Sequence, residues 1–504
     1  MMIIMKLSNL LLFVLPVIIS VIFTYFTYVN LLTVWIAFGV WLSMVVGFFI
    51  FINYYSVSKR SKKYYMPLAG KIQNYRIASF VTSFNEDPKI VESTLISVKN
   101  VTQKYGKVFL LDDSTNEEIR KELENFCKKN DIIYFHRENR KGFKAGAINE
   151  ALKKIEDSFD LVAIFDADQR PLEGFFEQVI PYFSDPKVAL VQIPQNYTET
   201  YTKIAQGAKY QQEPFLRIIM RGRSGYSAFS LGSGSVFRIS ALKDVGYFAE
   251  YSITEDAATS IKLNEKGYKT VYADVGLIWY GEPPEDLSAY LTQQSRWSFG
   301  YFQLLGEMLK SNLSFSQFFD YFSGFLYWVK EGPITILEFI SPIIFLSLRI
   351  PIVKINPILY VLLYIPYLII TIVLFSFSVK EKGEYGLKGF YYHQVVEYLE
   401  FYAITLSFIS WIFRRKIPFK VTPKGVVSRN FKLIIPHLIF IILLSLSDIL
   451  GIIWYLTSTS IILKAAIIVN IFWSTYQIPF LLGGILASRT YNIEKPKYTE
   501  IVSK

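Results

Sequence analysis

Four groups of acidic side chains follow segments that have the composition of short buried strands. Carboxylates in such positions bind a metal ion or take up a proton, depending on their spacing and their neighbours. The groups are Asn85–Asp87, Asp112–Asp113, Asp166 with Asp168, and Thr254–Asp256.

Asp166 and Asp168 are one residue apart, so both carboxylates can contact one hard divalent cation. Mg²⁺ or Mn²⁺ held in this way also accepts the oxygens of a diphosphate and neutralises charge on a departing phosphate. A turn that carries two solvated aspartates fits the same residues, and the pair alone does not separate these two hypotheses.

The segment Thr254–Asp256 precedes a helix-like run over Ala257–Lys266. Thr254 suits an N-cap, and acids in the first helical turn are favoured by the helix dipole. The same position gives a carboxylate a rigid mount within reach of a substrate hydroxyl, as a general base requires. Asp256 is the candidate base, and the capping role is compatible with it.

A further motif, Gln293-Gln294-Ser295-Arg296-Trp297, precedes the C-terminal apolar region. The planar guanidinium of Arg296 suits a diphosphate, and the ring of Trp297 suits the apolar face of a sugar. An amphipathic helix with a snorkelling arginine and an interfacial tryptophan accounts for the same residues. The two interpretations are compatible.

These side chains need elements that bring them together, and the middle of the chain has the pattern of an α/β domain. Short apolar strands over Ile77–Ser83, Val108–Leu111 and Leu161–Phe165 alternate with helix-like segments over Glu117–Lys128 and Ala145–Lys154. That alternation predicts a parallel sheet, with the ligand site beyond the carboxyl ends of its strands.

The composition places this domain in a membrane protein. Of the 504 residues, 52% are hydrophobic and 19% are charged, which excludes a disordered chain. The net charge of +11 is of the kind that cytoplasmic loops carry, and no nucleic-acid partner is expected from it. Cys127 is the one cysteine, which excludes an intrachain disulfide and a cysteine-based zinc cluster, and three histidines leave little for a His-ligated metal.

No charged residue occurs between Lys6 and Lys59. Leu7–Tyr28 and Leu31–Ile52 are each long enough to cross about 30 Å of hydrocarbon, so they predict a transmembrane hairpin. A cleaved signal peptide is the alternative for the first segment, but its apolar core is too long and a second span follows at once. The basic cluster that starts at Lys59 predicts that the following domain is cytoplasmic.

Four further spans are expected in the C-terminal part, which gives six spans with both chain ends in the cytoplasm. The segment Tyr391–Phe413 is not counted, because His393, Glu397 and Glu400 fit poorly in lipid and positive charge flanks both of its ends. An amphipathic helix in the membrane interface is expected there instead. The four spans are Pro333–Leu348, Ile358–Ser378, Leu433–Leu456 and Ile461–Ser488.

Taken together, the motifs resemble the D, DxD, TED, QxxRW signature of processive family 2 glycosyltransferases, which include cellulose and hyaluronan synthases. Asp113, Asp166 with Asp168, Thr254–Asp256 and Gln293–Trp297 match the signature in order. The segment Phe419–Gly425 is similar to the FxVTxK gating loop of cellulose synthases. Each motif is weak alone, but five in order with a matching membrane topology are strong, and the resemblance extends over roughly residues 5 to 488.

The resemblance implies an α/β GT-A glycosyltransferase domain with a mixed, mostly parallel sheet, inserted in an α-helical transmembrane domain of about six spans plus interfacial helices. It also implies a UDP-sugar donor, Mg²⁺ or Mn²⁺, and inversion at the anomeric carbon. The implied catalytic residues are Asp256, Glu255 and Thr254, with Asn85, Glu86, Asp113, Lys144, Asp166 and Arg296 on the donor, Asp168 and Asp166 on the metal, Gln293, Trp297, Gly232 and Ser233 on the acceptor, and Phe419, Val421, Thr422 and Lys424 in the gating loop.

Two departures from the family pattern bear on specificity and control. Leu231 stands where cellulose synthases usually have Cys in the acceptor-site stretch Phe229–Gly234, so the acceptor pocket is expected to differ. About sixteen residues follow the last expected span, too few for a PilZ domain, so control by cyclic di-GMP through such a domain is not expected.

The expected organisation follows from these assignments. An N-terminal transmembrane hairpin takes residues 1–58, the cytosolic GT-A domain 59–287, interfacial helices with QxxRW 288–330, and the channel region 331–490. The channel region includes the interfacial helix 388–413 and the gating-loop-like segment 418–425, and residues 491–504 form a cytosolic tail.

The expected function is a processive, inverting transferase of the plasma membrane that polymerises a sugar from a UDP-sugar and translocates the polysaccharide. UDP-glucose and a cellulose-like β-1,4-glucan are the first donor and product to consider. A non-processive transferase that moves one sugar to a polyprenyl phosphate, and an inactive nucleotide-binding transporter or scaffold, are the alternatives. QxxRW and the gating-loop segment argue against the first, and the complete acidic set argues against the second. The sequence does not name the sugar, the linkage, the oligomeric state or accessory subunits.

Overall fold

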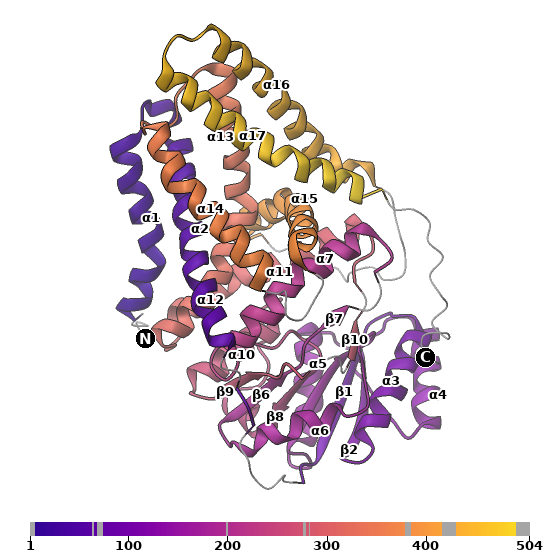
Figure 1. Ribbon diagram of the computed structural model, residues 1–504. Coiled ribbons are helices and arrows are strands. Elements are labelled where there is room, and N and C mark those ends of the chain that lie inside the picture. The colour runs from indigo at the N-terminus through magenta and orange to yellow at the C-terminus, as the bar shows by residue number, and fades with distance from the viewer. Residues whose placement is uncertain are drawn as a thin grey trace.

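The computed structural model describes residues 6–62, 65–67, 74–197, 200–275, 279–281, 283–378, 385–415 and 430–489. Within them, a sheet flanked by helices lies at one end of the molecule and a bundle of long helices at the other (Figure 1). The predicted gating-loop segment 418–425, with Phe419, Val421, Thr422 and Lys424, lies outside the described residues, as does the tail at 491–504.

The large sheet has seven strands in the order β3-β2-β1-β4-β8-β6-β9. All neighbours in this order pair in parallel except β8, which runs antiparallel to both β4 and β6. The prediction of a mixed, mostly parallel sheet is therefore confirmed. The strands are β1 (Ile77–Ser83), β2 (Gly106–Asp112), β3 (Ile133–His136), β4 (Leu161–Asp166), β6 (Val188–Gln192), β8 (Ser235–Arg238) and β9 (Lys269–Tyr272).

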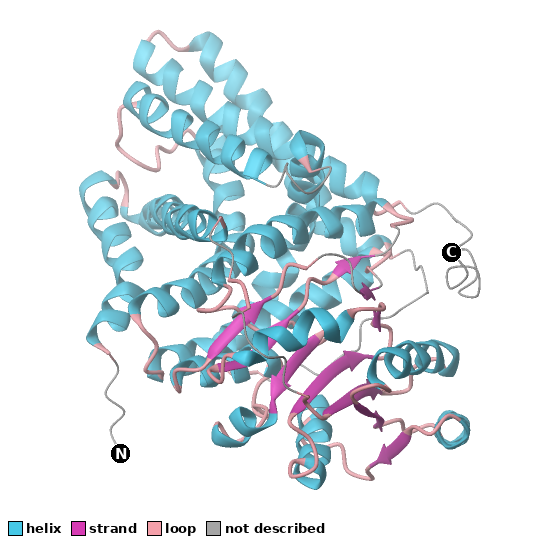
Figure 2. Ribbon diagram, turned by 60° about the horizontal axis from the view of Figure 1, so that its bottom comes forward, coloured by secondary structure: helices cyan, strands magenta, loops and turns pink. Residues whose placement is uncertain are grey.

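Helices cover both faces of this sheet, which explains why its central strands are mostly apolar and buried (Figure 2). One face packs against α3 and α6 and the other against α5, α9 and α10. A small sheet of β5 (Arg170–Pro171), β10 (Trp279–Gly281) and β7 (Asn196–Tyr197) lies beside it. The helices of this part are α3 (Pro88–Thr102), α4 (Glu117–Lys129), α5 (Phe143–Ile155), α6 (Phe175–Val179) with η2 (Ile180–Ser184), α9 (Ile239–Asp244) and α10 (Glu255–Glu265).

Long helices connect the sheet domain to the bundle. A chain of α7 (Lys203–Pro214), the π-helical turn η3 (Phe215–Met220) and α8 (Arg221–Arg223) leaves the domain and returns to it. α11 (Leu287–Lys310) then carries the QxxRW residues towards the bundle. α12 (Phe315–Val329) continues through a second π-helical turn, η4 (Lys330–Ile334), into α13 (Thr335–Leu348).

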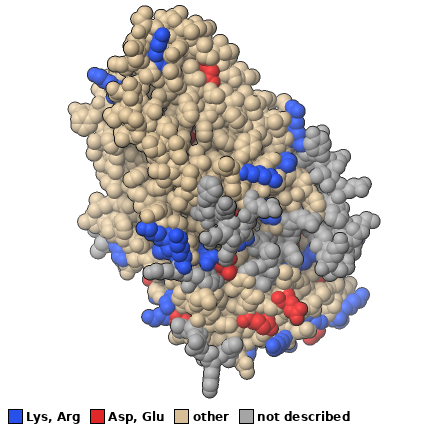
Figure 3. All heavy atoms as spheres, in the orientation of Figure 1, with Lys and Arg blue, Asp and Glu red and all other residues tan. Residues whose placement is uncertain are grey.

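The bundle consists of helices whose outward side chains are mostly apolar. Exposed Leu, Ile, Val and Phe side chains cover α1, α14, α16 and α17. Figure 3 shows few charged side chains over the bundle and more over the sheet domain. Such a surface needs lipid around it, and the protein is a multi-pass membrane protein. The bundle helices are α1 (Leu7–Thr27), η1 (Leu31–Thr33), α2 (Val34–Ser61), α13, α14 (Pro357–Ser378), α15 (Gly386–Ile412), η5 (Phe431–Ile434), α16 (Ile435–Thr457) and α17 (Ile461–Ala487).

Among the described residues, seven helices are long and apolar enough to cross a membrane, one more than the sequence predicts. The additional candidate is α15. Glu397 and Glu400, which argue against a span there, both turn towards protein partners: the Tyr327 hydroxyl donates to Glu397 at 2.9 Å, and the Tyr290 hydroxyl lies 2.7 Å from Glu400. Carboxylates that are satisfied inside the protein do not exclude a helix from the membrane. Figure 1 shows α15 nearly end-on, across the direction of α2 and α13.

The candidate span that was expected to start at Pro333 also differs. In the structure it begins at Phe315, because α12, η4 and α13 form one continuous helical segment to Leu348. Pro333 lies inside the π-helical turn rather than at a helix end, so the helical segment continues through it.

A buried polar network fastens the N-terminal hairpin to the rest of the protein. Asp320 of α12 accepts hydrogen bonds from Asn53 of α2 at 2.9 Å, from Arg60 at 2.6 Å and from Ser227 at 2.5 Å. Three segments that are far apart in the sequence therefore meet at one carboxylate, which fixes α2 against α12 and the sheet domain.

Candidate active site

The carboxyl ends of the parallel strands and the starts of α5, α10 and α11 surround a cleft of about 360 Å³. Most of the residues that the sequence singles out line it, although they come from seven separate segments. Asn85 and Ser233 are not among the lining residues. The predicted residues in the lining are Glu86, Asp113, Lys144, Asp166, Asp168, Gly232, Thr254, Glu255, Asp256, Gln293, Arg296 and Trp297.

Asp256 lies in the first turn of α10, with its carboxylate turned into the cleft. Its Oδ1 accepts a hydrogen bond from the Ala257 amide at 2.7 Å, which fixes the side chain. Burial and the neighbouring charge of Glu255 raise the pKa of Asp256 to about 7, although Lys144 acts in the opposite direction. A carboxyl group with this pKa can take up a proton near neutral pH, as a general base must.

Glu255 precedes the base and is affected by the same surroundings. Burial raises the pKa of Glu255, while the charges of Lys144 and Arg296 lower it in part. Two adjacent, partly buried carboxylates disfavour each other's ionisation, so Glu255 helps to keep the pKa of Asp256 raised.

Thr254 occupies the N-cap position of α10, but its side chain makes no capping hydrogen bond. Its hydroxyl lies 3.3 Å from that of Ser252 instead. On its other side Thr254 contacts α11, where a Cβ built on Gly300 would lie 2.4 Å from Cγ2 of Thr254. Thr254 therefore lies at the point where α11 packs closely against the start of α10. The predicted capping hydrogen bond of Thr254 is absent.

Lys144 joins two parts of the cleft near the start of α5. Its ammonium lies 2.5 Å from Oδ1 of Asp166 and donates to the carbonyl of Gly232 at 2.8 Å. Burial alone would lower the pKa of Lys144, but the negative charges of Asp166, Glu255 and Asp256 raise it overall. A permanent positive charge is thereby held between the DxD turn and the candidate base.

The DxD residues lie on the turn that follows β4. The amide of Asp166 donates to the hydroxyl of Ser233 at 2.9 Å, so Ser233 supports the turn from behind although it does not line the cleft. Asp168 is buried, with 6% of its surface exposed. Among the described residues, no group of three or more His, Cys, Asp or Glu side chains gathers to hold a metal. Two hard carboxylate donors at the edge of an open cleft fit Mg²⁺ or Mn²⁺ that completes its shell with substrate phosphate and water.

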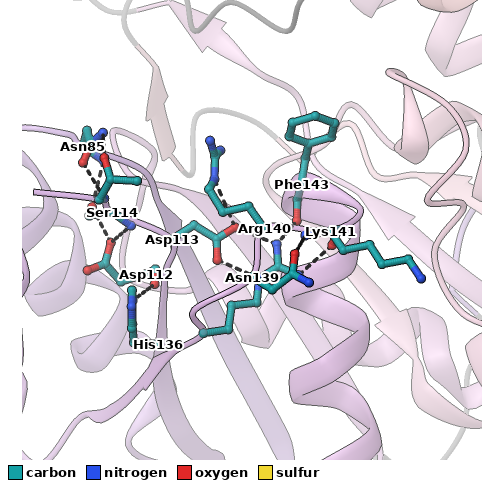
Figure 4. Close-up of polar contacts among 11 residues, drawn as sticks. Asn85, Asp112, Asp113, Ser114, His136, Asn139, Arg140, Lys141 and Phe143 are labelled. Atoms are coloured by element: carbon teal, nitrogen blue, oxygen red, sulfur yellow. Dashed lines mark hydrogen bonds and ion pairs between the residues drawn. The ribbon is translucent and has the colours of Figure 1, made fainter.

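Asp113 is held by an arginine that the sequence did not indicate. Arg137 donates to both carboxylate oxygens of Asp113, each at 2.7 Å, and the two side chains are almost fully buried. Arg137 also donates to the backbone carbonyl of Lys141 at 2.8 Å and to that of Phe143 at 2.5 Å (Figure 4). The pair thus shapes the loop that leads to Lys144. Arg137 lies 24 residues from Asp113 in the sequence, so no local spacing predicts the contact.

The predicted donor residue Asn85 has a supporting position. Its side-chain carbonyl accepts from the amides of Thr115 and Asn116 at 2.9 and 3.2 Å, and its backbone is left-handed with φ of +50°. Its own amide donates to the hydroxyl of Ser114 at 2.8 Å (Figure 4). Asn85 therefore ties the loop after β1 to the loop after β2. Its neighbour Phe84 lines the cleft, with the Arg140 guanidinium 3.3 Å from the centre of its ring.

Two glutamines near the end of β6 form a cradle for the acceptor-site stretch. Gln192 accepts from the amide of Leu231 at 2.8 Å and donates to the carbonyl of Ser233 at 2.9 Å, and Gln195 donates to the carbonyl of Leu231 at 3.1 Å. No motif in the sequence predicts either residue as part of the site. The signal was a glutamine in an otherwise apolar, fully buried strand, which requires backbone partners.

The motif residues of α11 share one helix face because Gln293, Arg296 and Trp297 are three and four residues apart. α11 starts with a side-chain cap, in which Asp286 accepts from the Ala289 amide at 2.7 Å. Trp297 lines the cleft and is partly buried against the apolar core that joins α10, α11 and α12. The helix thus presents an amide, a guanidinium and an indole to the same cleft.

The chain resembles known proteins in both sequence and fold. Residues 161–375 match the model of "Glycosyl transferase family group 2". A UDP-forming cellulose synthase catalytic subunit of Xanthomonas axonopodis pv. citri is 33% identical over 50% of this chain and 36% of its own length. That of Komagataeibacter xylinus is 25% identical over 88% of this chain and 60% of its own length. The chain therefore spans less than two thirds of either relative.

Among solved structures, a mannosyltransferase from Pyrobaculum calidifontis in complex with GDP-Man and Mn²⁺ has a TM-score of 0.54. It is 13% identical in sequence, and the match covers 75% of this chain and 99% of the other. At this identity the match concerns the fold alone, and it agrees with the GT-A-like sheet described above.

Proposed function

We propose that this cellulose-synthase-like glycosyltransferase of family 2 builds a polysaccharide from a UDP-sugar and passes it across the plasma membrane. UDP-glucose and a β-1,4-linked glucan are the first donor and product to test. One observation carries the proposal: Asp256, with a pKa of about 7, faces the same cleft as the DxD carboxylates and the Arg296–Trp297 pair. The base, the residues for the leaving diphosphate and the residues for the acceptor sugar therefore all face one cleft.

The donor side of the cleft combines negative and positive groups. Asp166 and Asp168 would hold Mg²⁺ or Mn²⁺, which supplies charge neutralisation for the departing diphosphate. Lys144 and Arg296 add fixed positive charge to the same side. Asp113, which Arg137 holds in place, and the Phe84–Arg140 stack line the part of the cleft that would receive the nucleoside.

The acceptor side supplies the base. Asp256 would accept the proton of the acceptor hydroxyl as that oxygen attacks the anomeric carbon and the nucleoside diphosphate departs. One displacement with a positioned base inverts the anomeric carbon and needs no covalent nucleophile. Trp297 would support the apolar face of the terminal sugar, and Gln192 and Gln195 would fix the backbone of Leu231–Gly234 beneath it.

A second cavity, of about 340 Å³, supports translocation. It lies among α2, α13, α14, α15 and α17, and Tyr364, Trp473 and Tyr476 form an aromatic wall in it. Gln477 faces the same cavity, and its side-chain carbonyl, which is buried, has no hydrogen-bond donor among the described residues. Aromatic rings and free polar acceptors are what a polymer of sugars needs inside a membrane. The basic residues Lys59, Arg60 and Lys62 at the end of α2 support a cytosolic catalytic domain.

The test is incorporation of labelled sugar by purified protein from a panel of UDP-sugars with Mg²⁺ or Mn²⁺, followed by sizing of the product. Long chains from one donor support the proposal and name the sugar. Transfer of a single sugar, only when a polyprenyl phosphate is added, would replace it with the lipid-linked transferase. Donor binding with no transfer from any UDP-sugar would indicate a nucleotide-binding scaffold.

A further inference from the structure

A polar cluster centred on Gln211 of α7 connects the catalytic helix to the membrane cavity. Gln211 accepts a hydrogen bond from Gln294 of α11 at 3.4 Å and lies 2.8 Å from the hydroxyl of Tyr290 on the same helix. Its amide nitrogen donates to Glu400 of α15 at 3.2 Å and to the hydroxyl of Tyr327 of α12 at 3.3 Å. One side chain therefore contacts three other helices.

The two ends of this cluster lie at the two cavities of the protein. Gln294 adjoins Gln293, which lines the catalytic cleft, and Arg296 and Trp297 follow within one turn. At the other end, Tyr327 donates to Glu397 at 2.9 Å, and both of these side chains line the membrane cavity. Among the described residues, the cluster thus forms a hydrogen-bonded connection between the two.

The donors along this connection all point the same way. Gln294 donates to Gln211, Gln211 donates to Tyr327, and Tyr327 donates to Glu397. Hydrogen bonds in such a chain polarise one another, so breaking one member weakens the rest. A shift of α11 relative to α12 would stretch the hydrogen bonds of this series.

Apolar packing alone would be enough to hold α7, α11 and α15 together. The surrounding core already packs Ile204 and Ala208 of α7 against Leu291 of α11 and Val396 and Leu399 of α15. α7 and α15 approach so closely that a Cβ built on Gly207 would lie 2.2 Å from Val396. Buried polar groups add little net stability to such packing, but they specify one relative position of the helices.

We propose that Gln211 and Glu400 form a positioning junction, which couples the position of α11 in the catalytic cleft to the membrane cavity. Through this coupling, each addition of a sugar is followed by movement of the polymer into the membrane cavity. The inference rests on the proposed function, because it concerns what happens to a polymer after each transfer. Neither residue touches the donor or the reacting atoms. Their effect is on whether the polymer end stays engaged between additions.

The test compares two substitutions that break the chain at different places. Gln211→Met removes all the hydrogen bonds of Gln211 at nearly constant volume. Tyr327→Phe removes the two hydrogen bonds that connect Gln211 to Glu397 and the cavity, and it leaves those of Gln211 with α11 and Glu400 in place. Asn53→Leu is the matched control, since it removes a buried amide that, among the described residues, bonds Asp320 and Ser323 of α12 and no member of the junction. Two quantities are measured for each purified protein: the rate of single-sugar transfer to an added short acceptor, and the length of the polymer made without it.

The junction predicts that Tyr327→Phe, which removes two hydrogen bonds, shortens the polymer at least about fivefold, the factor expected from loss of one of them, while single-sugar transfer falls less than about twofold. Gln211→Met shortens it at least as much, and Asn53→Leu leaves the ratio of length to rate unchanged. Equal polymer lengths in wild type and Tyr327→Phe would overturn the junction alone. So would a parallel loss of rate and length in Gln211→Met, which indicates a merely structural role. A wild-type protein that adds one sugar only would overturn the proposed function and the junction with it.

Discussion

Gly232 lies directly against the candidate base: a Cβ built on Gly232 would lie 3.1 Å from Oδ2 of Asp256. The backbone of Gly232 is left-handed, with φ of +85°, and its carbonyl accepts from Lys144 at 2.8 Å. Glycine is therefore required here both by the backbone conformation and by the space that the carboxylate occupies. The acceptor-site stretch and the base form one unit through this contact.

Gly232→Ala should lower the transfer rate by about a hundredfold, because the methyl group displaces the Asp256 carboxylate. A misplaced base loses most of its contribution to the rate. Gly267→Ala is a matched control: its φ is also +85°, but nothing lies within 4 Å of the added Cβ. Both variants carry similar backbone strain, so their unfolding temperatures should fall together. If the two lose activity equally, strain alone accounts for the effect and the contact with Asp256 is unimportant.

The transfer rate should depend on pH through Asp256. The base acts in its ionised form, and its pKa of about 7 is raised by burial and by the charge of Glu255. The ratio kcat/KM should therefore rise with pH to a plateau above about 7 and fall about tenfold for each pH unit below it.

Glu255→Gln should move this half-maximal pH to a lower value, because it removes the neighbouring negative charge that raises the pKa of Asp256. Glu118→Gln, an exposed acid in the first turn of α4, is the control and should leave the profile in place. A profile of Glu255→Gln that coincides with the wild type would mean that another group titrates.

Lys144→Met should raise KM for the UDP-sugar at least tenfold and lower kcat, because Asp166 and Asp256 lose the positive charge between them. Lys141→Met serves for comparison, since the Lys141 side chain is exposed and only its backbone carbonyl contacts Arg137. Steady-state kinetics with the preferred donor distinguishes the two. Wild-type values of KM and kcat in Lys144→Met would remove Lys144 from the donor site.

Removal of divalent cations with EDTA should abolish transfer, and Mg²⁺ or Mn²⁺ should restore it. Asp168→Asn should raise the cation concentration needed for half-maximal rate at least tenfold, since one of two hard oxygen ligands is weakened. Titration of the apo protein with Mn²⁺ in the presence of UDP, followed by the Mn²⁺ spectroscopic signal, measures the same affinity without turnover. Undiminished Mn²⁺ binding in Asp168→Asn would exclude that residue as a ligand.

The arrangement of local elements could be predicted well from the sequence. β1 coincides with the predicted strand at Ile77–Ser83, and α4 and α10 begin at or within two residues of the predicted starts. Alternating apolar runs and acids after strand ends predict a parallel α/β sheet with a ligand site beyond the carboxyl ends of its strands, and the cleft lies at that edge. These signals are local, and each is contained within about ten residues.

Contacts between distant segments could not be predicted in this way. Arg137 binds Asp113, and Gln192 cradles Leu231, because the fold brings together residues that have no fixed spacing. The partners of the α15 carboxylates could not be predicted for the same reason, since Tyr290 and Tyr327 come from other helices, and α15 is a candidate span by its length and composition. A charged residue in an apolar segment argues against a membrane helix only when the side chain has no polar partner inside the protein.

The most direct test of the account compares the wild-type protein with Asp256→Asn, using labelled UDP-sugar and sizing of the product. The account predicts long polysaccharide from the wild type, a loss of transfer of at least a hundredfold in Asp256→Asn, and UDP binding that is largely unchanged, because the base contributes to transfer and not to nucleotide affinity. Full polymer synthesis by Asp256→Asn would contradict the account, since the carboxylate that the cleft holds ready would then not be the base.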